Sequence, residues 1–227
     1  MLKSNILAPE QFSNDAKSVN FREICMGEIA PNTLFRSSHP IKENKQDYII
    51  SQLAGFTKIS SIVNLCDTAS GIMSKVLCAP WYNILFDNDR VIAHGMDFSF
   101  TSDGFKNKFK DAIKFILRTE GPWLIHCHAG VDRTGFVSIV LESFMNAPLD
   151  KVINDYLKSF NSGFESDIFG NTENTDIQTA MQVISAMSET QLIDEHNLQQ
   201  IAEIYLRQKI GITAEEAQLL RLKLSGK

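Results

Sequence analysis

The sequence is poor in cysteine, and its cysteines are widely spaced. It has four, at Cys25, Cys66, Cys78 and Cys127, and no two of them form a CxxC pair. This spacing argues against a zinc knuckle or a redox dithiol. In a chain of 227 residues a buried core can supply the stability without staples, so the cysteines are expected to be free thiols in a reducing compartment.

The sequence also lacks a long apolar run and a basic stripe. No stretch of about 18 apolar residues is present, which argues against stable membrane insertion. The segment 1–11 does not have the pattern of a secretory signal, so we expect a cytoplasmic protein, with export by a signal-less route left open. Lys and Arg number 22 against 27 Asp and Glu, and this acidic balance argues against nucleic acid as a partner.

The composition that remains is that of an ordinary globular domain. Apolar residues make up 44% of the chain and charged residues 22%, close to globular averages. No internal repeat, low-complexity tract or shift in composition marks a second domain. We therefore expect a single domain.

Short strands and one helix are predicted in the first half of the chain. Apolar and β-branched residues favour strands over 19–23, 33–37, 61–65 and 91–94, joined by loops. Residues 47–54 are predicted to form a short helix that ends at Gly55.

Helical periodicity dominates from residue 105 onward. Apolar residues recur on one face over 105–116, which predicts an amphipathic helix. Residues 123–126 are typical of a buried strand, and 134–145 is apolar nearly all round, which predicts a central buried helix. A strand, a short loop and a buried helix are half of a βαβ unit, so the sequence predicts an α/β core.

The last third of the chain is predicted to be helical. Helical spacing continues over 149–160 and 198–206, and Thr213 to Glu216 form a capping box that opens a terminal helix. The segment 161–176 is rich in Ser, Asn, Gly and acidic residues and is predicted to be a loop.

The most informative segment runs from His126 to Gly135 and reads HCHAGVDRTG. In it, Cys127 ends a predicted buried strand and Arg133 opens a predicted buried helix. The loop between them can turn backbone N–H groups inward beside the positive end of the helix dipole, where a tetrahedral dianion binds. The same field favours the thiolate form of Cys127. A thiolate beneath a bound phosphate can attack phosphorus in line and form a phosphocysteine.

Other residues of the segment suit the same chemistry. Arg133 can offer two parallel N–H bonds to phosphate oxygens, which a lysine cannot. Gly130 permits a backbone conformation that side chains oppose, and the Thr134 hydroxyl can donate to the sulfur. The expected phosphate-binding residues are His128, Ala129, Gly130, Val131, Asp132 and Arg133.

The spacing HCxxGxxRTG resembles the phosphate-binding loop of the cysteine-dependent protein tyrosine and dual-specificity phosphatase superfamily. Residues 20–23 and 34–38 resemble the NFR and L-[YF]-R-S elements of bacterial tyrosine phosphatases. The resemblance covers roughly residues 18–160, and 161–227 looks like a C-terminal helical extension within one phosphatase domain spanning 1–227.

This resemblance implies a central mixed or mostly parallel sheet flanked by helices, and a reaction that needs neither metal nor cofactor. It implies that Cys127 is the nucleophile and that His126 orients the loop and tunes the thiol. Thr134 and Arg36 are implied as supporting residues, with Arg36 as a buttress beneath the loop.

The general acid is left open by the sequence. In the family it is an Asp on a loop a few tens of residues before the Cys, and Asp97 lies 30 residues before it, between a predicted strand and a predicted helix. Asp87 and Asp89 are alternatives, and so is Asp132, because a nearby dianion favours a protonated carboxyl. The plain alternative for Asp97 is a turn residue that precedes a helix.

The substrate is expected to be a phosphorylated protein or a small phosphomonoester, bound as a phosphate-like anion. A protein tyrosine phosphatase, with dual specificity left open, is favoured over a phosphoinositide or inositol-phosphate phosphatase. Bacterial phosphoinositide phosphatases often carry Lys where this chain has Val131. A phosphate-recognition module without turnover is the alternative of another class. A sulfur transferase is disfavoured because the loop has the phosphatase spacing and Thr134.

Overall fold

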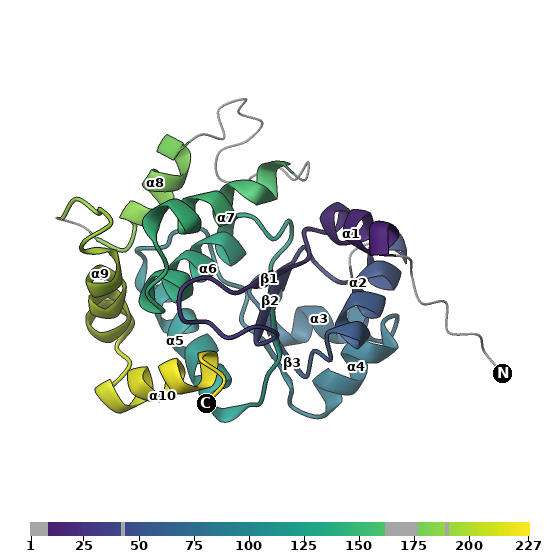
Figure 1. The fold of residues 1–227 in the computed structure, drawn as a ribbon. Helices are drawn as coiled ribbons and strands as arrows, with labels where there is room; N and C mark the ends of the chain where they lie inside the picture. The colour runs from purple at the N-terminus through teal and green to yellow at the C-terminus, as the bar shows by residue number, and fades with distance from the viewer. Residues whose placement is uncertain (1–8, 42–43, 162–176, 189–190) are drawn as a thin grey trace.

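The computed structural model describes residues 9–41, 44–161, 177–188 and 191–227, and a five-stranded sheet lies at its centre (Figure 1). The strands are β1 (Arg22–Ile24), β2 (Leu34–Ser37), β3 (Ser61–Asn64), β4 (Val91–Ala93) and β5 (Trp123–His126). Their order across the sheet is β1-β2-β5-β3-β4; β1 is antiparallel to β2, and the other pairs are parallel. The predicted α/β class with a mostly parallel mixed sheet is confirmed.

Helices cover both faces of this sheet (Figure 1). One face carries α1 (Pro9–Ser18), α2 (Asn44–Phe56), α3 (Ala69–Val76) and α4 (Pro80–Asp87). The other face carries α5 (Asp103–Arg118) and α6 (Asp132–Phe144), with the C-terminal helices packed outside them. These are α7 (Leu149–Asn161), α8 (Ile177–Ser185), α9 (Leu198–Ile204), the π-helix η1 (Tyr205–Ile210) and α10 (Ala214–Leu224). No described helix combines the length and apolar character that a membrane crossing requires.

The two faces have separate hydrophobic cores because side chains alternate along each strand. Leu34 and Ile125 belong to the core beneath α5 and α6, whereas Phe35 and Leu124 belong to the core beneath α2, α3 and α4. Strands β2, β3 and β5 are buried along their whole length, as parallel strands covered on both sides must be.

Helix α6 is the central buried helix that the sequence predicts. All of its residues are buried, and the ring of Phe136 stacks on that of Phe100 with 4.3 Å between centroids. The helix begins at Asp132, two residues before the predicted start at 134, so the loop after β5 contains only residues 127–131. The predicted helices over 105–116 and 149–160 lie within α5 and α7, and the Thr213–Glu216 capping box opens α10.

Several predicted boundaries are wrong for local reasons. The first strand begins at Arg22 instead of residue 19, because Asn20 adopts a φ of +53° in a turn. Helix α2 runs on through Gly55 to Phe56, and the left-handed residue after it is Lys58. The predicted helix over 198–206 ends as α-helix at Ile204 and continues as η1.

Helices α1, α3 and α4 lie where the sequence analysis predicts strands and loops. Helix α4 is eight residues long and starts at Pro80, and α3 is capped by the Thr68 side chain, which accepts from the Gly71 amide. Helices this short have too few turns to show a clear hydrophobic periodicity in the sequence. Whether they form is determined by tertiary packing. The predicted loop lies almost entirely in 162–176, outside the described residues. The division into a core and an extension stays a prediction.

Helix α6 also buries an acid. Glu142 is 1% exposed, and among the described residues its carboxyl oxygens have no hydrogen-bond partner. Burial, together with the charge of Asp155, raises the pKa of Glu142 well above its usual value of 4.5, although Arg36 and Arg22 oppose the shift. The folded protein therefore keeps Glu142 protonated in a pH range where the unfolded chain ionises it.

The contribution of Glu142 to stability should fall as the pH rises. Above about pH 4.5 the unfolded chain binds fewer protons than the folded protein, and each further pH unit costs about 1.4 kcal/mol until the folded group ionises. Glu142→Gln removes this loss. The free energy of unfolding of the variant relative to wild type, from urea titrations, should therefore increase between pH 5 and pH 7. Glu195→Gln, at an exposed side chain, is the control; the same trend in both variants would contradict the buried acid.

Candidate active site

The loop 127–131 lies at the carboxyl end of β5, between β2 and β3 in the sheet. Because β2, β3 and β5 are parallel, the residues that follow all three strands meet at this edge. Cys127 at the base of the loop is 1% exposed and Arg133 is 4% exposed, whereas His128 is exposed. The edge therefore holds the predicted thiol and guanidinium in one short turn of chain.

Three loop carbonyls accept hydrogen bonds from donors outside the loop. Asn20 Nδ2 donates to the Ala129 carbonyl at 3.1 Å, and the His39 amide donates to the His128 carbonyl at 2.9 Å. Arg36 Nη2 donates to the Gly130 carbonyl at 2.7 Å. When carbonyls are held on the outer side of a turn, its amides can face the inside, which is the arrangement of an anion-binding nest.

Gly130 is required for two reasons. Its φ is +74°, in the left-handed region that side chains disfavour. A Cβ at this position would also lie 2.4 Å from the Ser37 carbonyl oxygen at the end of β2. The loop thus packs directly on the neighbouring strand.

Arg36, for which the sequence predicts a supporting role beneath the loop, lies on β2 and contacts the loop through the Gly130 carbonyl. It is fully buried, and its Nη1 donates to Asp155 Oδ2 at 3.0 Å. Burial lowers the pKa of Arg36 to about 10, which leaves it a cation at neutral pH. Burial alone would raise the pKa of Asp155, but the charges of Arg36 and Arg22 hold it below its usual value. Asp155 on α7, which the sequence analysis missed, is therefore the anion that makes the buried guanidinium tolerable.

Arg133 contacts the segment that contains Asp97. Its Nη1 donates to the Met96 carbonyl at 3.0 Å, and its guanidinium lies 4.2 Å from the centroid of the Phe98 ring. The carboxylate of Asp97 accepts from the Ser99 amide at 2.8 Å and is within 3.4 Å of the Ser102 hydroxyl, at the start of α5. The structure thus brings the Asp97 segment to the loop, with the Asp97 side chain itself exposed.

The other acid candidates occupy different places. Asp132 is 1% exposed at the start of α6, and its charge helps raise the pKa of Tyr156, after the larger effect of burial. It therefore lies toward α7. Asp87 ends α4, and Asp89 follows it in a turn with a φ of +56°. Both precede β4 and so lie at the opposite edge of the parallel sheet from the loop, which disfavours them.

The remaining predicted residues lie in the loop or directly next to it in the chain. Thr134 is fully buried, and its hydroxyl has no hydrogen-bond partner among the described residues. Ala129 is half-buried, and Val131, the last residue of the loop before α6, is fully buried. His126 is fully buried, and burial holds its pKa well below its usual value, so it is neutral.

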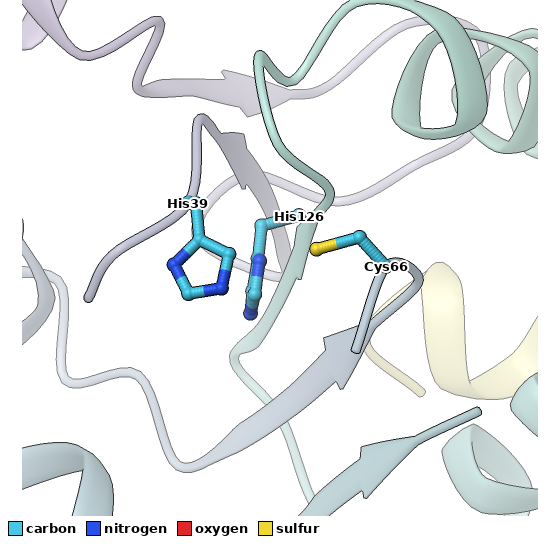
Figure 2. A group of neighbouring side chains, drawn as sticks. All are labelled: His39, Cys66 and His126. Carbon is cyan, nitrogen blue, oxygen red and sulfur yellow. The ribbon is translucent and has the colours of Figure 1, made fainter. Parts of the chain in front are cut away.

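A polar network that the sequence analysis missed lies behind the loop. The Tyr82 hydroxyl is 3.2 Å from His126 Nε2 and 3.1 Å from Asn64 Nδ2, which also donates to Asp67. Asp67 Oδ2 accepts from His39 Nε2 at 2.6 Å. Figure 2 shows His39 and His126 facing one another at the ends of their strands. The only sequence signal for this network was the position of His39, Asn64 and Asp67 at or just beyond the ends of predicted parallel strands.

Comparisons with known proteins show which family the sequence matches. The sequence profile of the tyrosine phosphatase family matches residues 87–226, from the end of α4 through the loop to the last helix. Among solved structures, the core catalytic domain of the PP-IP phosphatase SIW14 from S. cerevisiae, in complex with citrate, matches with a TM-score of 0.43 and 21% identity. That match covers 71% of this chain and 83% of the other. No curated protein matches the chain.

The profile match does not separate bacterial from other members, so the bacterial subgroup stays a prediction. It does extend over more than half of the 227 residues and includes the whole segment from Asp97 to Arg133. The chain therefore belongs to the tyrosine phosphatase family and is a cysteine-dependent phosphatase.

Proposed function

We propose that this phosphatase hydrolyses phosphotyrosine in proteins through a cysteinyl-phosphate intermediate on Cys127. The observation that carries the proposal is the buried Cys127 thiol at the base of a loop whose carbonyls accept hydrogen bonds from outside the loop. Arg133, at the start of α6, stacks on the ring of Phe98. The phosphate dianion binds within the loop, against the amides of residues 128–133 and the start of α6. Arg133 holds two of its oxygens and stabilises the charge of the transition state.

The reaction proceeds in two displacements. The Cys127 thiolate attacks phosphorus, the P–S bond forms, and the bond to the ester oxygen breaks while an acid gives that oxygen a proton. Water then attacks the phosphocysteine, the P–S bond breaks, and the same carboxylate takes the water proton. The Thr134 hydroxyl donates to the sulfur and stabilises it as a leaving group in this second step.

Asp97 is the acid that we propose. Its segment already contacts Arg133 through the Met96 carbonyl, so the acid and the phosphate-binding guanidinium belong to one assembly. Its carboxylate is exposed and is held by the Ser99 amide and the Ser102 hydroxyl, which a change of rotamer would release. Asp132 is disfavoured because it is buried toward Tyr156 on α7.

The aromatic ring at the site supports phosphotyrosine as the substrate. Phe98 is 40% exposed while it stacks on the Arg133 guanidinium, so one part of the ring is available to a substrate phenyl group. Cys127 is 1% exposed, and a buried thiol favours the longer phosphotyrosine side chain over the short phosphoserine. Val131, which is fully buried, adds no cation for further ring phosphates.

The substrate class is tested with a panel of phosphorylated compounds assayed without added metal. We expect the highest kcat/KM for phosphotyrosine peptides, lower values for phosphoserine and phosphothreonine peptides, and the lowest for phosphoinositides and inositol phosphates. Higher kcat/KM for phosphoinositides would overturn phosphotyrosine as the substrate. Cys127→Ser should abolish turnover of every compound, since it removes the nucleophile. Cys78→Ser, at an exposed thiol, is the matched control and should keep full activity.

The acid is tested by comparing Asp97→Asn with Asp132→Asn. Loss of a general acid costs about 10²- to 10⁴-fold in kcat, and the loss is greatest for leaving groups that need a proton. Asp97→Asn should therefore lower kcat strongly for phosphotyrosine peptides and less for p-nitrophenyl phosphate, whose phenolate leaves readily. The same pattern in Asp132→Asn, with Asp97→Asn unaffected, would assign the acid to Asp132.

A further inference from the structure

Three metal-binding side chains meet behind the phosphate loop. His39 follows β2, Cys66 follows β3, and His126 ends β5. One potential ligand atom of each, two nitrogens and one sulfur, lies within 4.8 Å of the others, and Figure 2 shows the three side chains converging. They are far apart in sequence, and the parallel sheet alone brings them together.

A fourth donor lies next to two members of this group. Asp67 Oδ2 lies 2.6 Å from His39 Nε2 and 3.7 Å from Cys66 Sγ. The other oxygen of this carboxylate, Oδ1, accepts from Lys75 Nζ at 2.8 Å, so Oδ2 is the one turned toward the cluster. The group therefore offers two imidazole nitrogens, one thiol sulfur and one carboxylate oxygen.

We propose that His39, Cys66, Asp67 and His126 form a zinc site. Imidazole, thiolate and carboxylate are the ligands that Zn²⁺ takes, and four of them satisfy its tetrahedral preference. A thiolate and a carboxylate also balance its two charges. Zinc–ligand bonds of about 2.0–2.3 Å place neighbouring donors about 3.3–3.6 Å apart. On binding, the His39 nitrogen and the Asp67 oxygen, which are 2.6 Å apart, therefore have to separate. Cys66 is only partly buried, which leaves a path for the ion.

Zinc binding would change the hydrogen bonds that His126 and His39 make. His126 Nδ1 faces the carbonyl of Cys127 at 3.5 Å, which leaves Nε2 as the ligand atom once the Tyr82 hydroxyl gives way. In His39, Nδ1 accepts from the Ile41 amide at 3.0 Å, so its proton is on Nε2. Coordination through Nε2 moves that proton to Nδ1 at the cost of one hydrogen bond. The Cys66 thiol loses its proton to solvent as the Zn–S bond forms.

Zinc bound at this site would link the ends of three strands. A ligand that binds the folded chain raises its thermal stability, so zinc should raise the Tm. The site is separate from the catalytic thiol, because Cys127 is not among the ligands, yet one ligand is the residue directly before it. This proposal does not depend on which substrate the phosphatase hydrolyses.

The test uses the full chain with Cys127→Ser, which removes the catalytic thiol as a competing ligand and needs no turnover. Titration with Co²⁺, a spectroscopic substitute for zinc, should give one equivalent of binding. The spectrum should show a near-ultraviolet sulfur-to-cobalt charge-transfer band and the intense visible bands of tetrahedral cobalt. Zinc should displace the cobalt and raise the Tm.

Variants in this background locate the site. Cys127→Ser/Cys66→Ser should lose the charge-transfer band and the zinc-dependent rise in Tm. Cys127→Ser/His39→Gln should weaken cobalt binding at least tenfold, which gives a second reading should the first variant fold poorly. Cys127→Ser/Cys78→Ser, which removes an exposed thiol, is the matched control and should behave like Cys127→Ser. Absence of stoichiometric cobalt binding, or a charge-transfer band that survives Cys66→Ser, would overturn the proposal.

Discussion

The position of the loop 127–131 depends on one buried ion pair, between Arg36 and Asp155. Arg36 donates to the Gly130 carbonyl and to Asp155, and so connects the loop to α7 through the interior of the protein. A guanidinium this deeply buried is tolerated only if an anion and hydrogen bonds compensate its lost hydration, and Asp155 provides both. Without this contact the Gly130 carbonyl would lose its side-chain hydrogen-bond donor, and the loop would be held less firmly.

The same ion pair sets the local charge. Arg22 and Arg36 both contact Asp155, and burial raises the pKa of nearby Glu142, which favours its neutral form. The guanidinium charges therefore exceed the carboxylate charge directly beneath the loop. This local excess explains how a chain with a net charge of -5 can favour a dianionic substrate. Catalysis and stability are linked here, since the buried acid that keeps this balance also lowers stability at high pH.

The sequence was sufficient for everything that depends on short spacing. The strand, loop and buried helix from 123 to 144 follow from contiguous residues, as do the roles proposed for Cys127 and Arg133, and the predicted α/β class is confirmed. Short helices such as α3 and α4 were missed because their formation depends on packing against the sheet. Asp97 follows β4, whereas Asp87 and Asp89 precede it. Only the observed direction of β4 in the sheet shows that Asp97 therefore lies on the same side as the loop.

Contacts between distant segments could not be predicted in this way. Asp155 lies 119 positions from Arg36 in the sequence, and nothing in its helical pattern marks it as a counter-ion. The cysteine spacing argues against a zinc knuckle, yet parallel strand ends place Cys66 beside two histidines from other segments. Motif spacing identifies metal ligands that are close together in the sequence. It does not identify ligands from distant segments that parallel strands bring to the same end of a sheet.

The central claim is that Cys127 carries the phosphoryl group during turnover, and rapid acid quenching of the enzyme with a phosphotyrosine peptide tests it most directly. Digestion and mass spectrometry should find one phosphate on the peptide that contains Cys127, and none after quenching of Cys127→Ser. Phosphate on any other residue, or hydrolysis in the burst phase with no phosphorylated enzyme at any quench time, would contradict the account.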